Sequence, residues 1–225
     1  MDLSGIQLLQ ALVLVPATLL PIINPLSTAP VFAATVGTDK VLSEKLARQI
    51  AVNGWYVIVA SIMVGSYVLD LFGISLPVVR IGGGLLVAAT AWRLLNSSGS
   101  DDVKDAAAEK AASLSQAEIV RRSFFPLTFP LTTGPGTIAA AIALGAQIPP
   151  RAAAYLAGAI VAGLGALLVS IVLYLVLRNA AAVLARLGEV GTLVMTRLMA
   201  FILLCIGIQI IWTGWAELNG LPRLE

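Results

Sequence analysis

Two long uncharged apolar stretches of this chain are each interrupted in the middle by prolines and small polar residues. The stretch Leu3–Thr38 is interrupted by PIINPLSTAP (Pro21–Pro30), and the stretch Ser123–Pro150 is interrupted by FPLTFPLTTGPG (Phe125–Gly136). Both are longer than the roughly 20 residues that cross the hydrocarbon of a bilayer. Proline removes a backbone donor and clashes with the preceding turn, so we expect each helix to break near the midplane. Such a break persists only where protein or a water-filled cavity surrounds it.

The composition indicates an integral membrane protein that is not an enzyme. The chain has 225 residues, of which 59% are hydrophobic and 12% charged, about half the charge of a soluble domain. It has no histidine, its only cysteine is Cys205, and no HExxH or Walker A motif occurs. We therefore expect no catalytic residue, metal site or cofactor. The net charge of +2 and the lack of a basic run predict no nucleic-acid partner. The start MDLSGIQ lacks the basic region of a signal peptide, so we expect the first apolar stretch to be retained.

The pattern of apolar segments predicts an all-α polytopic protein with six transmembrane helices. Residues 1–96 form a first three-span unit, 97–122 a polar linker, and 123–225 a second three-span unit. The six expected spans are Gly5–Val36, Ile50–Leu69, Ser75–Leu95, Phe124–Ile148, Ala152–Leu177 and Thr192–Trp215.

The two units resemble each other weakly, which favours an internal repeat. Each opens with a proline-interrupted span, and each closes with a span that carries an arginine and then a tryptophan: Arg80 and Trp92, Arg197 and Trp212. Because three is odd, the second unit enters the membrane from the opposite side, so the 3+3 repeat is inverted. Similar composition of six apolar helices is the alternative explanation.

The distribution of lysine and arginine predicts the orientation. One side carries only Arg80, Arg151 and Arg223, and all other lysines and arginines fall on the opposite side. The positive-inside rule puts the lysine-rich side, including 97–122, in the cytoplasm. Both termini are then outside.

The two breaks offer chemistry for a small zwitterion. A helix that restarts inside the membrane presents unpaired N–H groups and the positive end of its dipole, which suits a carboxylate. The half-helices that precede the breaks offer carbonyls for an ammonium group. Neutral side chains at the two breaks are Asn24, Ser27, Thr28, Thr132 and Thr133, and Ser27 and Thr28 are also expected to cap the first restart. Gly134 and Gly136 leave room for a ligand to approach the backbone. Ordinary proline kinks packed with small residues are the alternative.

Arg80 is expected about one turn inside the third span, because the apolar run after it, Ile81–Trp92, is too short to span alone. Charges at such depth are rare and often functional, so Arg80 is a candidate to steer or gate an anionic group. Snorkelling of the side chain to the outer headgroups explains the same position. The sequence leaves these two roles open.

Three segments carry a resemblance to a known family. They are INPLSTAPVFAAT (Ile23–Thr35), RIGGGLLVAATAW (Arg80–Trp92) and FPLTTGPGTIAAAI (Phe129–Ile142), and the polar segment before the second half also matches. The chain resembles the MarC family, also described as a neutral amino acid transporter family of six-span inner-membrane proteins and distantly grouped with the lysine-exporter superfamily. The resemblance covers essentially the whole chain. It implies that Asn24 and Pro25 form the family's NP motif, and that Gly134, Pro135 and Gly136 form its GPG motif.

The expected function is secondary transport of a small neutral amino acid such as glycine or alanine across the inner membrane. Alternating access would come from one repeat rocking against the other around the midplane site. The alternatives are a channel for a small solute or ion, and a membrane protein with a structural or regulatory role. The expected partners are the amino acid and the lipid bilayer, and the sequence leaves open whether the chain forms a homo-oligomer.

Overall fold

The computed structural model describes residues 5–37, 39–96, 123–148 and 152–221, and in these ranges the chain is helical without strands. The linker expected at 97–122 lies outside the described residues. The helices are α1 (Gly5–Ile23), α2 (Pro25–Val36), α3 (Lys40–Leu71), α4 (Leu76–Asn96), η1 (Ser123–Thr132), α7 (Pro135–Gly145), α8 (Ala152–Arg178) and α9 (Ala180–Leu218).

Within the described ranges, four helices are long and apolar enough to cross a membrane: α3, α4, and the parts Tyr155–Arg178 of α8 and Val190–Leu218 of α9. A fifth span exists if Leu12–Ile23 and α2, which are bent by 54° relative to each other, are counted as one. The fourth expected span, Phe124–Ile148, corresponds to η1 and α7. Of these two, α7 is an apolar helix too short to cross a membrane alone. The structure thus has four or five candidate spans where the sequence predicts six.

The interruption between α1 and α2 is centred on Asn24. Its backbone is left-handed, with φ 46° and ψ 67°, and Pro25 occupies the first position of α2. A non-glycine residue in this region is uncommon, and asparagine tolerates it better than most side chains. The Asn24 N–H still donates to the carbonyl of Leu20, so the chain turns sharply within a single residue.

The interruption between η1 and α7 has a different geometry. Prolines at positions 126 and 130 have no N–H to donate, and the segment forms a π-helix instead of an α-helix. Its side chains follow the wider spacing, since the Thr128 and Thr132 hydroxyls donate to the carbonyls five residues earlier. Gly134 is extended, and Pro135 begins α7. A π-helix of ten residues is rare, and π-helical turns are frequent at functional sites.

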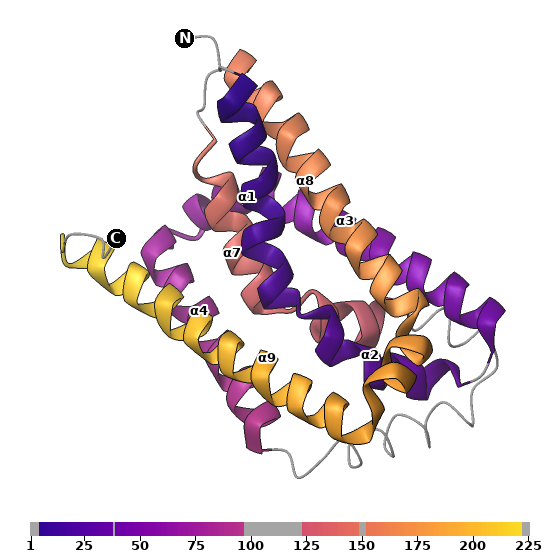
Figure 1. Ribbon diagram of the computed structural model, residues 1–225. Helices are drawn as coiled ribbons and strands as arrows, with labels where there is room; N and C mark the ends of the chain where they lie inside the picture. The colour runs from indigo at the N-terminus through magenta and orange to yellow at the C-terminus, as the bar shows by residue number, and fades with distance from the viewer. Residues whose placement is uncertain (1–4, 38, 97–122, 149–151, 222–225) are drawn as a thin grey trace.

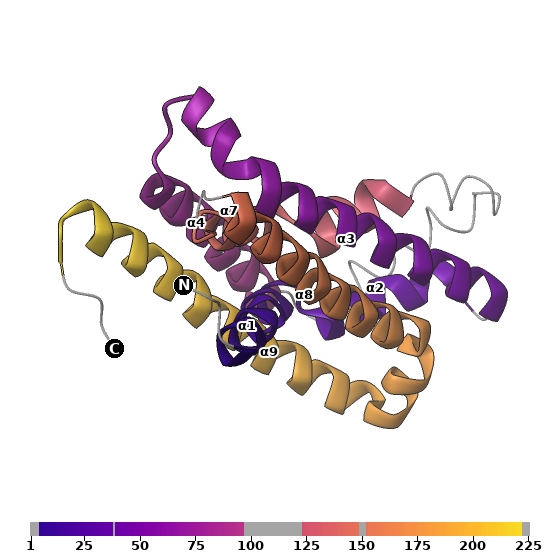
Figure 2. The same cartoon turned by 90° about the horizontal axis from the view of Figure 1, so that it is seen from above.

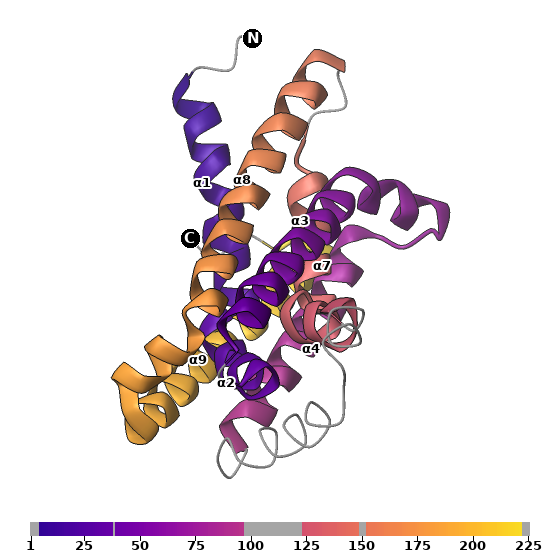
Figure 3. The same cartoon turned by 90° about the vertical axis from the view of Figure 1, so that its right-hand side faces the viewer.

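The helix contacts follow an exchange pattern, meaning that the same kinds of contact occur when the two halves of the chain are interchanged. Helix α4 makes its main contacts with α9, while α3 packs on α7 and η1, and α8 packs on α1 and α2. Figures 1 and 3 show α1 and α8 side by side, Figure 2 shows α3 running beside α8, and Figure 1 shows α9 against α4. If α1–α2, α3 and α4 are exchanged with η1–α7, α8 and α9, the pairs α4–α9 and α3–α8 map onto themselves. The pair α3–α7 then maps onto α8–α2, and the pair α3–η1 maps onto α8–α1.

Glycines bring α4 and α9 into close contact. A Cβ added to Gly207 would lie 2.7 Å from the backbone nitrogen of Ala88, and one added to Gly84 would lie 2.8 Å from the Gly207 carbonyl oxygen. Small residues of this kind let membrane helices approach backbone to backbone. Gly188, with φ 66°, kinks α9 near its start.

Candidate functional site

The polar residues at the two interruptions are buried inside the bundle. The exposed fractions are 5% for Asn24, 4% for Thr28, 2% for Thr132 and 0% for Thr133, and Thr137 at the start of α7 is also buried. A buried polar group is costly unless it is hydrogen-bonded, so the partners of these side chains decide what the site can do.

Ser27 and Thr28 do not cap α2 as the sequence predicts. Their hydroxyls donate backwards to the carbonyl oxygen of Asn24, at 2.9 Å and 3.2 Å, and α2 has no side-chain cap. Helical Ser and Thr side chains commonly bond back to the carbonyl three or four residues earlier, as Thr35 does to Val31 in the same helix. The prediction of a cap is therefore wrong, and both hydroxyl protons are used to fix the turn.

Thr132 and Thr133 differ in their hydrogen bonding although they are adjacent. The Thr132 hydroxyl donates to the Leu127 carbonyl at 2.6 Å, while the Thr133 backbone N–H donates to the Thr128 carbonyl at 2.7 Å. The Thr133 side-chain oxygen has no hydrogen-bond partner among the described residues. Thr133 therefore presents a buried hydroxyl that nothing in this part of the chain satisfies.

Unpartnered polar atoms occur at both interruptions. Among the described residues, the buried side-chain atoms without a hydrogen-bond partner are Asn24 Nδ2, Gln49 Oε1, Thr133 Oγ1 and Ser170 Oγ. Buried polar groups are nearly always paired in native proteins, and leaving one unpaired costs about 1–3 kcal/mol. One such atom lies at each break, Asn24 Nδ2 at the first and Thr133 Oγ1 at the second.

A glycine of α3, Gly54, lies beside the Thr133 side chain. A Cβ on Gly54 would lie 3.3 Å from Thr133 Oγ1, which is tighter than ordinary contact. Glycine in a helix interior costs about 1 kcal/mol relative to alanine, so its presence here needs a reason. The absence of a side chain at Gly54 lets the Thr133 hydroxyl pack closely against α3.

Gly136 packs against a helix. A Cβ at this position would lie 2.2 Å from Cγ2 of Val87, so Gly136 allows α7 to approach α4. The sequence predicts that Gly136 leaves room for a ligand, but in this structure the side chain of Val87 fills the space beside it. Gly134 is the residue before α7, with φ −80°, and Pro135 after it is exposed.

The two interruptions lie in the same inner part of the molecule. Helix α1 contacts α7, and α2 contacts η1, so each half-helix before a break touches the half-helix after the other break. Neither Asn24 nor Thr133 lines the cavity beside Arg80, the cavity between α3 and α8, or the one beside Asp39 and Arg178. Both side chains are buried in this conformation, while Pro135 at the second break is exposed.

A cavity of about 270 Å³ approaches the breaks from the side of Arg80. It lies between α1, α4, α7 and α9, and its polar lining residues are Thr18, Arg80, Gln147, Gln209 and Thr213. Its lining reaches Ala139, four residues after Pro135, which is about 6 Å along the helix. The cavity therefore ends about one helical turn from the second break.

Arg80 forms an ion pair that joins α4 to α9. Its guanidinium Nη1 donates to Oε2 of Glu217, and the side chains are 12% and 36% exposed. Arg80 is the fifth residue of α4, so it lies one turn from the start of this helix. Its charge is thus already balanced by a carboxylate at the edge of the cavity.

Reasoning from the sequence missed Glu217 and Gly54. Glu217 lies just after the sixth expected span, on the side where Arg80 was placed, so its opposite charge was an available signal. Gly54 stands alone in an apolar helical segment, where an isolated glycine often marks a close approach. No group of three or more His, Cys, Asp or Glu residues that could hold a metal ion occurs in the described residues.

Comparisons with known proteins confirm the family resemblance. Residues 9–218 of the chain match the sequence pattern of the MarC family of integral membrane proteins. Inner membrane proteins MarC of Escherichia coli K12 and of Shigella flexneri are each 32% identical to this chain over 219 residues, covering 95% of this chain and 97% of theirs. No solved structure matches. The match extends across both interruptions and nearly the full length, and the chain belongs to the MarC family of integral membrane proteins.

Proposed function

We propose that this protein is a secondary transporter of small neutral amino acids, such as glycine or alanine, with its binding site between the two helix interruptions. The observation that carries the proposal is the pair of buried, unpartnered atoms Asn24 Nδ2 and Thr133 Oγ1, one at each break. A buried polar group without a partner is destabilising unless a ligand satisfies it during the working cycle.

The groups at the breaks match the two ends of a zwitterion. Asn24 Nδ2 is a donor, and the first turns of α2 and α7 supply N–H groups and positive dipole ends, which together suit a carboxylate. The Thr133 hydroxyl both donates and accepts, and the carbonyls that end α1 and η1 suit an ammonium group. The absence of any ionised side chain at the breaks favours a substrate without net charge.

The cavity beside Arg80 suggests how the substrate reaches the breaks. Its volume of about 270 Å³ is near the lower limit for small-molecule pockets, which suits a small amino acid. The Arg80–Glu217 pair bridges α4 and α9 at this cavity. We assign this pair to the closure of the outer path, and a substrate carboxylate would compete with Glu217 for Arg80 during entry.

The exchange pattern of the helix contacts supports a 3+3 inverted repeat with six spans. In this arrangement α1–α2, α3 and α4 correspond to η1–α7, α8 and α9, and each interruption divides one span near the midplane. Such repeats transport by rocking around a central site. The lysine and arginine distribution supports an orientation with both termini outside, and the similarity to inner membrane proteins MarC supports location in the inner membrane.

Counterflow in proteoliposomes tests the proposal. Vesicles preloaded with unlabelled alanine should accumulate labelled alanine transiently and saturably, because a carrier exchanges substrate through one site. A channel would give uptake that neither saturates nor depends on preloading. No uptake for any member of a panel of small neutral amino acids would refute the proposed function.

A further inference from the structure

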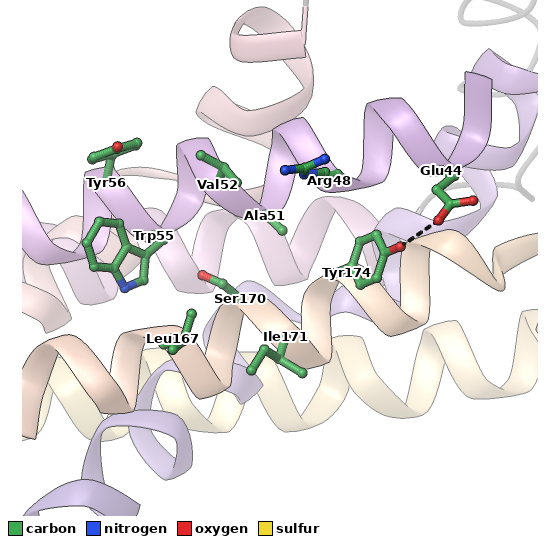
Figure 4. A pocket seen from close by; sticks show the side chains of 10 residues that line it. All are labelled: Glu44, Arg48, Ala51, Val52, Trp55, Tyr56, Leu167, Ser170, Ile171 and Tyr174. Atoms are coloured by element: carbon green, nitrogen blue, oxygen red, sulfur yellow. Dashed lines mark hydrogen bonds between the residues drawn. The ribbon is translucent and has the colours of Figure 1, made fainter. Parts of the chain in front are cut away.

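A groove lies on the surface of the molecule between α3 and α8. Its volume is about 610 Å³. Figure 4 shows the side chains that line it: Glu44, Arg48, Ala51, Val52, Trp55 and Tyr56 from α3, and Leu167, Ser170, Ile171 and Tyr174 from α8. Val52, Leu167 and Ile171 are each 44–45% exposed, so the apolar wall faces the surroundings of the protein.

The groove is polar at one end and apolar along the rest. At the polar end, Nη2 of Arg178 lies 3.5 Å from Oε1 of Glu44. The Arg178 guanidinium also lies over the ring of Tyr174, and the Tyr174 hydroxyl donates to Glu44. Arg48 lines the groove one turn after Glu44, and no ion pair of Arg48 occurs among the described residues. The one acidic side chain of the groove is thus engaged, and Arg48 leaves an unbalanced positive charge at its polar end.

Ser170 adds an unsatisfied hydroxyl deeper in the groove. It is 6% exposed, and its oxygen has no hydrogen-bond partner among the described residues. Figure 4 shows Ser170 between Ala51 and Trp55. Ala51 is three residues beyond Arg48, which is about 4.5 Å along the helix. A cation and a hydroxyl therefore follow each other into the groove, and apolar wall continues beyond them.

We propose that this groove binds an anionic glycerophospholipid of the leaflet at the Arg48 end. The phosphate lies against the Arg48 guanidinium, an ester group accepts a hydrogen bond from the Ser170 hydroxyl, and an acyl chain lies along Val52, Leu167 and Ile171. The order of the lining matches the order of a lipid: charged head, ester, hydrocarbon. Arg48 lies two residues before the apolar run that begins at Ile50, which places it at headgroup depth.

Electrostatics select an anionic lipid over a zwitterionic one. Both classes of lipid carry a phosphate, so the selection comes from net charge: a basic side chain near a membrane surface attracts anionic lipid, whereas the cationic headgroup of a zwitterionic lipid offsets its phosphate. Binding of the lipid is independent of what the protein transports, so the proposal does not rest on the proposed function.

Native mass spectrometry of the purified protein with added dioleoylphosphatidylglycerol or dioleoylphosphatidylcholine tests the proposal. The wild type should bind phosphatidylglycerol about five- to tenfold more tightly than phosphatidylcholine, since about 1.4 kcal/mol is a factor of ten. Arg48→Gln should remove this preference. Arg93→Gln, which changes an exposed arginine at the end of α4, is the matched control and should retain it.

A second variant separates headgroup recognition from the apolar groove. Val52→Trp should fill the groove and lower binding of both lipids, while the protein stays monodisperse in size-exclusion chromatography. Equal binding of the two lipids by the wild type, or unchanged preference in Arg48→Gln, would overturn the proposal. Cross-linking of a cysteine at Val52 to a second copy in the membrane would show that a protein chain occupies the groove, and would overturn it as well.

Discussion

Removal of the Glu217 carboxylate should open the cavity beside Arg80. The Glu217→Gln substitution keeps the size of the side chain and removes the charge that holds α9 to α4 through Arg80. A hydrogen bond to a charged group contributes about 1.5–3 kcal/mol, and an exposed ion pair at most about 1 kcal/mol. Because Glu217 is 36% exposed, we place the loss near 1.4 kcal/mol, a tenfold shift toward the open arrangement.

The assay is the rate at which a membrane-impermeant thiol reagent labels a cysteine in the cavity. Ala143 lines the cavity, and Cys205 is exposed, so Ala143→Cys is introduced into a Cys205→Ser background. Glu217→Gln should raise the labelling rate about tenfold, and the reversed pair Arg80→Glu with Glu217→Arg should restore slow labelling.

The matched control is Glu44→Gln, which removes the acidic partner of the other ion pair among the described residues, on α3. It should leave labelling at Ala143→Cys unchanged. A Glu217→Gln protein that is folded and labelled at the wild-type rate would refute the role of the ion pair in closure.

Two further predictions concern glycines. Gly207→Ala should lower the free energy of unfolding by about 1–3 kcal/mol in a detergent melt, since its Cβ would lie 2.7 Å from the backbone of Ala88, whereas Gly163→Ala, with nothing within 4 Å, should be neutral or stabilising. A melt in which both variants lose the same stability would contradict this packing. Gly54→Ala should raise the KM for alanine uptake with little loss of stability, because its methyl presses on the Thr133 hydroxyl, and an unchanged KM would remove Gly54 from the site.

The sequence predicts helix ends and membrane helices well, because both depend on neighbouring residues: a proline ends a helix, and a long apolar run forms a membrane helix. Asn24 precedes Pro25 and Gly134 precedes Pro135, and a helix of the structure ends before each pair and another begins at the proline. The family and the membrane helices also follow from such patterns. That each interruption divides one of six spans at the midplane remains part of the proposal.

Other features depend on contacts that are distant in the chain, and no local pattern specifies them. The pairing of Arg80 with Glu217 and the approach of Gly54 to Thr133 need the helix packing itself. The Ser27 and Thr28 hydroxyls bond back to the Asn24 carbonyl, as helical Ser and Thr side chains commonly do, so the capping prediction failed on a local rule and not on a distant contact.

The most direct test of the central claim is the Thr133→Val substitution, measured for both stability and transport. Valine has the shape of threonine without the hydroxyl, so the substitution removes a buried, unpartnered group and should raise the free energy of unfolding by about 1–2 kcal/mol. It should also lower alanine uptake at least tenfold, because in the proposed site the hydroxyl contacts the substrate. Thr132→Val is the control, since its hydroxyl donates to Leu127 and its loss should reduce stability. If Thr133→Val transports like the wild type, or loses stability as Thr132→Val does, the substrate site does not lie at the breaks.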